Sequence, residues 1–206
     1  MNQQGRVGQT IKCATLFFGV GCLVGFVSGW LAFRRRLVLD DLTGLPNQRA
    51  VLPTLRRRLR RAVRRRSPIC VALLDIDHFK TANTSFGYAA ADGLLQEFVA
   101  RMGRECSRRG VALLRFRSGD EFLLVMNDMD EASGNRFLQN LARMLAATPF
   151  QIRGSDYWLS FSVGMRCLEI SQQSELTDLN QVIESLLDDC EGRLATGKEP
   201  GDRHVH

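Results

Sequence analysis

Hydrophobic and polar positions follow three different patterns along this chain. Residues 13–33 are 21 consecutive positions without a charge, long enough for a helix to cross a hydrocarbon core of about 30 Å. Residues 69–76 form a short apolar run typical of a strand buried on both faces. Apolar residues recur at helical spacing near 89–102, 131–147 and 179–194, and shorter runs predict strands at 111–116 and 122–126 and a strand pair over about 150–168. This order predicts an α+β fold, with helices packed over a mixed, largely antiparallel sheet, preceded by one transmembrane helix.

The pattern divides the chain into a tail at 1–12, a transmembrane helix at 13–33, a basic juxtamembrane linker at 34–39 and one domain at 40–203. A cleavable signal peptide is the alternative for the apolar run, but the run is long and no small-x-small cleavage site follows it. Three arginines come directly after the run, so the positive-inside rule predicts a single-pass protein whose C-terminal domain is cytoplasmic.

Gly21, Gly25 and Gly29 recur every four residues within the apolar run. This spacing places small residues on one helix face, where a second helix backbone can approach closely. We therefore expect a homodimer held in the membrane, although glycine is frequent in transmembrane helices that have no such partner.

The positive charge of the chain is concentrated rather than spread. The formal net charge is +6 and the sequence pI is about 9.3, and eight of the eleven residues from 56 to 66 are arginine. Asn47 is a suitable N-cap for a helix carrying these arginines. A solvated helix face is one interpretation, and attraction to anionic membrane lipid is another, because the cluster follows a predicted anchor. We expect no nucleic-acid partner.

The cysteines show no metal-binding pattern. None belongs to a C-x-x-C pair or has a histidine at zinc-ligand spacing. We expect all six to be reduced in a cytosolic setting: Cys13, Cys22, Cys70, Cys106, Cys167 and Cys190.

Acidic residues gather at two strand ends. Asp75 and Asp77 are two apart at the end of the 69–76 run, and Asp120 and Glu121 follow Gly119 at the tip of a predicted hairpin. If the two strands are neighbours, these carboxylates converge and need a cation between them. Carboxylate oxygens favour a hard divalent ion, so the arrangement predicts Mg²⁺ or Mn²⁺, which also binds nucleotide phosphates.

Three motifs make the chain resemble a known family. Ser118-Gly119-Asp120-Glu121-Phe122 is similar to the G-G-D-E-F signature of diguanylate cyclase domains, with serine for the first glycine. Residues 40–47 (DDLTGLPN) resemble the entrance motif of that family, and residues 75–80 (DIDHFK) resemble its metal-binding strand and turn. Residues 160–164 (SFSVG) resemble a late strand. The resemblance covers about residues 40–203 and implies a palm-like fold shared with polymerases and nucleotide cyclases.

The resemblance also implies an activity and a set of roles. The activity is a Mg²⁺-dependent nucleotidyl transfer at a bacterial inner membrane, in which two GTP molecules become cyclic di-GMP, a signal associated with biofilms. It implies metal binding by Asp75, the Ile76 carbonyl, Asp120 and Glu121, with Asp120 and Glu121 catalytic. It implies substrate binding by Asn83 and Asp92 at the guanine edge and by Lys80, Ser118, Gly119 and Lys198. Each domain presents one GTP, so the resemblance implies an active homodimer.

Several positions depart from the family pattern. Ser118 replaces a glycine, and Tyr88 stands where histidine is common. Asp202 occupies the position where the family has an arginine near the end of the domain, and the arginine of this chain, Arg203, comes one residue later. The R-x-x-D of the family's product-inhibition site is Arg109 to Ala112 here and lacks its aspartate. A catalytically inactive domain that binds GTP or a protein partner is therefore the alternative function.

Overall fold

The computed structural model describes residues 38–117, 119–170 and 178–197. Its centre is a four-stranded sheet in the order β2-β3-β1-β6, in which every pair is antiparallel. The strands are β1 (Ile69–Ile76), β2 (Ala112–Arg115), β3 (Glu121–Asn127) and β6 (Phe161–Leu168). The predicted antiparallel character is confirmed, but the term "mixed" is wrong for the described strands, since none of their pairs is parallel.

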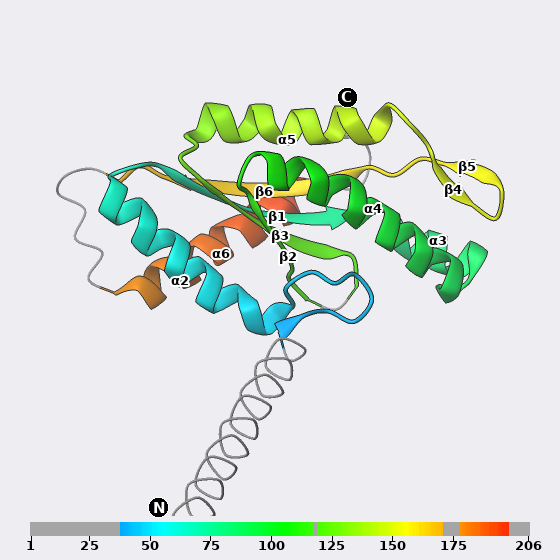
Figure 1. The fold of residues 1–206 in the computed structure, drawn as a ribbon, viewed down its shortest axis with the longest axis horizontal. Coiled ribbons are helices and arrows are strands. Elements are labelled where there is room, and N and C mark those ends of the chain that lie inside the picture. Colours follow the sequence, from blue (N-terminus) through cyan, green and yellow to red (C-terminus); the bar gives the residue numbers. More distant parts are fainter. Residues whose placement is uncertain (1–37, 118, 171–177, 198–206) are drawn as a thin grey trace, which may run out of the picture. The chain divides into compact units, whose positions relative to one another are not determined.

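Helices cover both faces of this sheet (Figure 1). One layer contains α3 (Phe79–Phe86), α4 (Tyr88–Arg108) and α5 (Glu131–Ala146), and the other contains α2 (Gln48–Arg65) and α6 (Leu179–Gly197). A separate small hairpin is formed by β4 (Phe150–Ile152) and β5 (Ser155–Tyr157). The single helix predicted near 89–102 is in fact the C-terminal half of a pair, α3 and α4, joined at Gly87.

The central strand β1 shows why two helical layers are needed. All eight of its residues are buried. Alternate side chains of a strand point to opposite faces, and accordingly Ala72 belongs to the core under α4 and α5, whereas Val71 belongs to the core under α2 and α6. The continuous apolar run thus follows from burial on both sides.

Two residues explain how the helices are positioned. Asn47 caps α2, because its side chain accepts a hydrogen bond from the Arg49 amide at 3.0 Å, as predicted. Gly164 in β6 lies directly beneath α6, where an added Cβ would stand 2.1 Å from the Cys190 carbonyl oxygen. Only glycine therefore permits this close contact between β6 and α6.

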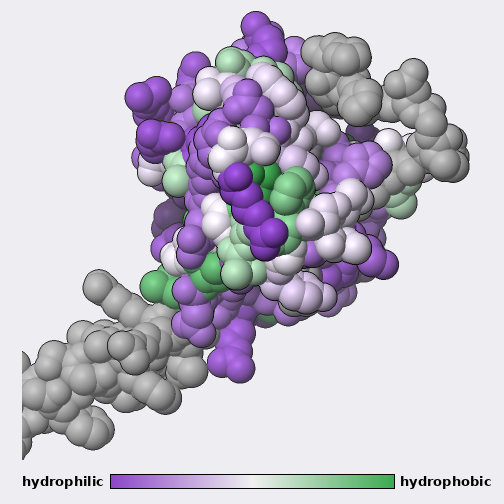
Figure 2. Space-filling model, turned by 90° about the vertical axis from the view of Figure 1, so that its right-hand side faces the viewer, coloured by the Kyte–Doolittle hydropathy of each residue, from purple (hydrophilic) through white to green (hydrophobic). Residues whose placement is uncertain are grey.

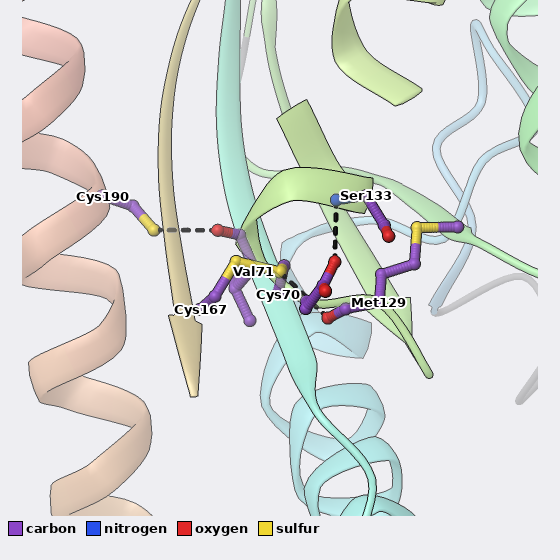
Figure 3. The surroundings of a disulfide bond; sticks show 7 residues. Cys70, Val71, Met129, Ser133, Cys167 and Cys190 are labelled. Atoms are coloured by element: carbon purple, nitrogen blue, oxygen red, sulfur yellow. Dashed lines mark hydrogen bonds between the residues drawn. A yellow bond between two sulfur atoms is a disulfide. The ribbon is translucent and has the colours of Figure 1, made fainter. Parts of the chain in front are cut away.

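The cysteines differ from the prediction. Cys70 in β1 and Cys167 in β6 are direct cross-strand partners and form a disulfide, with their Cα atoms 4.0 Å apart (Figure 3). The expectation that all six are reduced is therefore wrong for this pair. Spacing along the chain does not reveal the pair, because 97 residues separate the two cysteines and only the register of β1 with β6 brings them together. Cys106 and Cys190 are free and buried. Cysteine usage therefore does not by itself indicate a reducing compartment.

The predicted transmembrane helix at 13–33, with Gly21, Gly25 and Gly29, lies outside the described residues. Among the helices that the structure does describe, none combines the length and the apolar character that a membrane crossing requires.

Candidate functional site

The two predicted acidic groups meet at one end of the sheet. Asp75 in β1 is the direct cross-strand partner of Glu121, the first residue of β3. The Ile76 amide donates a hydrogen bond to the Asp120 carbonyl at 3.2 Å. Asp75 is only 9% exposed. The pairing of β1 with β3 therefore brings together four positions that the sequence places 45 residues apart.

Asp77 has a different role from the one its spacing suggested. It lies just beyond β1, and its carboxylate accepts hydrogen bonds from the Ser160 hydroxyl at 2.6 Å and the Ser162 hydroxyl at 2.7 Å. Its amide donates to the Ser160 carbonyl at 3.0 Å. Two hydroxyl donors satisfy this carboxylate without a cation, so Asp77 ties the end of β1 to β6. The serines of residues 160–164 are thereby explained.

Arg115 connects the entrance loop to the hairpin that carries Asp120. Its guanidinium donates to the Asp40 carboxylate at 2.6 Å and, through two nitrogens, to the Gly119 carbonyl at 3.2 and 2.7 Å. Arg115 is 9% exposed. Arg115 is not among the residues predicted from the sequence, although a lone arginine in the apolar run 111–116 was a usable signal, because a buried charge requires partners.

Asp40 is the acceptor at the centre of this contact. Besides Arg115, it accepts hydrogen bonds from the Thr43 amide at 2.9 Å and the Thr43 hydroxyl at 2.6 Å. Partial burial by itself would raise the pKa of Asp40, but the hydrogen bonds from Thr43 and Arg115 outweigh it and hold the pKa below its ordinary value. The ionised carboxylate thus organises the entrance turn.

Arg117 places a cation beside Glu121. Its guanidinium lies 3.7 Å from a Glu121 carboxylate oxygen and 2.6 Å from a carboxylate oxygen of Glu191 in α6. Beside them is a hollow of about 220 Å³ whose lining is mainly apolar, formed by Leu73, Leu74, Phe116, Arg117, Glu121, Glu191, Leu194 and Ala195. Glu121 therefore faces both a cation and an adjoining hollow.

Gly119 adopts a backbone conformation that favours glycine. Its φ is +109°, a region that residues with a side chain rarely adopt, and no atom lies within 4 Å of an added Cβ. The reason for glycine is thus backbone conformation rather than crowding. Ser118 and Lys198 are outside the described residues.

The predicted guanine-binding residues lie on the paired helices α3 and α4. Asn83 is half-buried in α3, and Asp92 is exposed in α4. Gly87 joins the two helices with a φ of +79°, and its amide donates to the Asn83 carbonyl at 2.9 Å. Lys80 is exposed in the first turn of α3. Figure 2 looks onto this end of the domain and shows a largely hydrophilic surface with a small apolar area near its centre.

The donors near Asp75 suit a hard divalent ion in their chemistry, since all are carboxylate or carbonyl oxygens. Within the described ranges, however, no three side chains of Asp, Glu, His or Cys form a group that could hold a metal. A donor set built at this place would therefore have to be mixed, with carboxylates supplemented by backbone oxygens such as the Ile76 carbonyl.

Comparison with known proteins agrees with this geometry. The family described as "Diguanylate cyclase, GGDEF domain" matches residues 37–192. Diguanylate cyclase DgcP from Pseudomonas aeruginosa is 32% identical over 142 residues, which are 69% of this chain and 21% of DgcP. Response regulator PleD from Caulobacter vibrioides is 30% identical over 128 residues, which are 62% of this chain and 28% of PleD. The chain thus spans less than a third of either relative.

Solved structures show the same fold. The coiled coil and GGDEF domain of DgcB from Caulobacter crescentus, in complex with c-di-GMP, matches with a TM-score of 0.77 at 20% identity, covering 91% of this chain and 94% of that one. Diguanylate cyclase SiaD from Pseudomonas aeruginosa, in complex with its activator SiaC, matches with a TM-score of 0.68 at 23% identity, covering 96% of this chain and 71% of that one. At these identities the likeness concerns the fold alone.

Proposed function

The chain belongs to the GGDEF family of diguanylate cyclase domains, and on this premise we propose that it condenses two GTP molecules into cyclic di-GMP with release of two pyrophosphates. The observation that carries the proposal is the pairing of β1 with β3, which sets Asp75 and Ile76 beside Asp120 and Glu121. These are the positions to which the family signature assigns metal and phosphate binding.

In this proposal Asp75, the Ile76 carbonyl, Asp120 and Glu121 hold Mg²⁺ or Mn²⁺. When bound, the ion neutralises the triphosphate and lowers the pKa of the attacking 3′-hydroxyl. Asp120 also accepts the proton of that hydroxyl. The Asp120 backbone is held by its hydrogen bond from Ile76, and Arg115 holds the preceding Gly119 carbonyl.

The remaining site residues position the substrate. Asn83 accepts and donates hydrogen bonds at the guanine edge and Asp92 accepts them, from helices whose relative placement depends on the turn at Gly87. The residues proposed to contact the phosphates are Lys80, Ser118, Gly119 and Lys198. Gly119 lets the backbone approach them, since its Cα carries no side chain.

Bond formation requires two such domains, because each holds one GTP and the two reacting groups must face each other. We propose a homodimer in which the glycine face at residues 21, 25 and 29 joins two anchors in a bacterial inner membrane. The domain at 40–203 then lies in the cytoplasm, where GTP is available.

A GTP-binding regulator without activity is the second candidate. Arg117 favours it, because its guanidinium lies 3.7 Å from the carboxylate of Glu121 and competes with a metal ion for that oxygen. Ser118 and the altered residues 198–203 point the same way.

One experiment separates the two functions. Full-length protein in detergent is incubated with GTP and Mg²⁺, and cyclic di-GMP and pyrophosphate are measured by chromatography. We expect product from the wild type and from Asp188→Ala, which removes an exposed carboxylate of α6, but none from Asp120→Ala. GTP binding without product, even when dimerisation is enforced by a fused dimer, would establish the inactive regulator.

A further inference from the structure

The outer face of α2 is the most strongly charged surface in the described part of the chain. The helix buries Val51, Leu55, Leu59 and Ala62 against the sheet, and this spacing leaves the opposite face to solvent. Arg57, Arg60 and Arg64 are exposed there. With Pro53 and Arg56 they line an open hollow of about 460 Å³. We refer to these three exposed arginines and the hollow as the arginine face.

Within the described ranges, little of this charge is neutralised by carboxylates. α2 contains eight arginines, and the one carboxylate found within 4.0 Å of any of them among the described residues is Asp128, which lies 3.6 Å from Arg61 and 3.9 Å from Arg65. Arg56 donates to the neutral Asn180 side chain at 2.9 Å, and Arg58 donates to the Gly110 carbonyl at 2.7 Å.

The arginines of α2 also act on one another electrostatically. Burial first, and then the charges of Arg57 and Arg61, lower the pKa of Arg58. Neighbouring arginines therefore destabilise one another's charged form, and a bound anion would relieve this repulsion.

We propose that the arginine face binds the headgroups of anionic phospholipids, so that the domain lies against the membrane surface. Guanidinium groups donate two parallel hydrogen bonds to phosphate oxygens. Arg57, Arg60 and Arg64 follow one another at spacings of three and four, so they present a row about 10 Å long on one side of the helix. A flat array of phosphates is complementary to such a row.

Two features favour lipid over nucleic acid. α2 contains no aromatic residue, so it offers no platform on which bases could stack. Leu52, one turn before Arg56, is 40% exposed, and an exposed leucine beside arginines is suited to the boundary between headgroups and acyl chains.

The position of α2 in the chain supports the same partner. Fourteen residues separate the end of the uncharged run at 33 from the start of α2 at 48. If that run is the anchor proposed above, the short tether raises the local concentration of lipid, and even weak binding suffices. The inference rests on the proposed anchor and not on the cyclase activity.

The test measures whether lipid shields these arginines. Full-length protein is placed in nanodiscs of phosphatidylcholine, with or without phosphatidylglycerol, and arginines are modified with phenylglyoxal and located by mass spectrometry. We expect Arg57, Arg60 and Arg64 to react about tenfold more slowly in the anionic discs, and to regain their rate at about 0.5 M salt, where charge interactions are screened. Arg136 and Arg143, which belong to α5 in the other helical layer, should react equally in both discs.

Charge-removing variants give the matched control. In the triple variant Arg57→Gln, Arg60→Gln, Arg64→Gln, the equilibrium constant for docking of the domain on anionic discs should fall on the order of a hundredfold, at about fivefold per arginine. Arg61 and Arg65 of α2 remain in this variant and report whether the helix still docks. In anionic discs they should react with phenylglyoxal as fast as they do in neutral discs. The control variant Arg104→Gln, Arg136→Gln, Arg143→Gln removes the same charge elsewhere and should keep Arg61 and Arg65 shielded.

The outcomes are distinct. Equal reaction of the arginine face in neutral and anionic discs would overturn the inference, as would shielding produced only by an added DNA duplex, which would indicate nucleic acid instead. Flotation of the discs reports separately on the anchor, since a chain that fails to float with neutral discs lacks it. Neither result depends on whether cyclic di-GMP is made.

Discussion

Replacing Arg115 with methionine tests the contact between the entrance loop and the hairpin that carries Asp120. The change keeps the length of the buried side chain but removes one hydrogen bond to Asp40 and two to the Gly119 carbonyl. Hydrogen bonds to charged groups contribute about 1.5–3 kcal/mol, and breaking a fully buried ion pair costs about 3–5 kcal/mol.

The Asp40 side chain is 22% exposed and keeps its two hydrogen bonds from Thr43, so the loss should be smaller than for a fully buried pair. We expect Arg115→Met to lower the free energy of unfolding by about 2–4 kcal/mol. Arg104→Met, which changes an exposed arginine of α4, should cost less than about 0.5 kcal/mol. Urea denaturation of the full-length protein in detergent, followed by circular dichroism, measures both.

A double-mutant cycle with Asp40→Asn isolates the interaction. Asparagine keeps the acceptor oxygen for Thr43 but removes the charge, so the two substitutions should be coupled by about 1–2 kcal/mol. Additive effects of the two substitutions, or a loss below about 0.5 kcal/mol for Arg115→Met, would refute the assigned role.

The pH dependence has a definite sign. Because the pKa of Asp40 is lowered in the folded protein, its contribution to stability is present above the ordinary carboxyl pKa of about 3.9 and is lost as the pH falls through the lowered value. The difference between the wild type and Arg115→Met should therefore narrow in acid.

Three further predictions concern packing, positioning and reactivity. Gly164→Ala should destabilise the protein by at least about 2 kcal/mol, because its Cβ would stand 2.1 Å from the backbone of α6, whereas Gly192→Ala, an exposed helical position with open space, should be neutral or stabilising in the same urea assay. Ser162→Ala should cost about 1–2 kcal/mol by the same measurement, because it removes a 2.7 Å hydrogen bond to the Asp77 carboxylate; an unchanged midpoint would contradict the assignment. Burial raises the pKa of Cys106 to about 12, so iodoacetamide should modify this thiol at neutral pH only after unfolding, and mass spectrometry of the folded protein should find it intact.

The amino-acid sequence by itself determined the family and most of the elements. It did not predict α3, and it placed one strand pair over 150–168, where the structure has the β4–β5 hairpin and β6 of the central sheet. The run at 69–76 predicts a strand buried on both faces, and β1 is one. The apolar runs at 111–116 and 122–126 predict the hairpin formed by β2 and β3, and Asn47 caps α2 as expected. These are local properties, because periodicity, capping and turn chemistry depend on residues close together in the chain.

Tertiary structure alone decided which distant side chains meet. The partners of Asp77 lie 83 and 85 residues away, Arg115 reaches Asp40 across 75 residues, and Cys70 joins Cys167 across 97 residues. None of these contacts follows from spacing along the chain, because the contacts of Asp77 and Cys70 depend on the register of β1 with β6, and that of Arg115 depends on where the entrance loop packs. A shift of one residue would turn every side chain to the other face, and the register is set by the packing of both sheet faces against their helices.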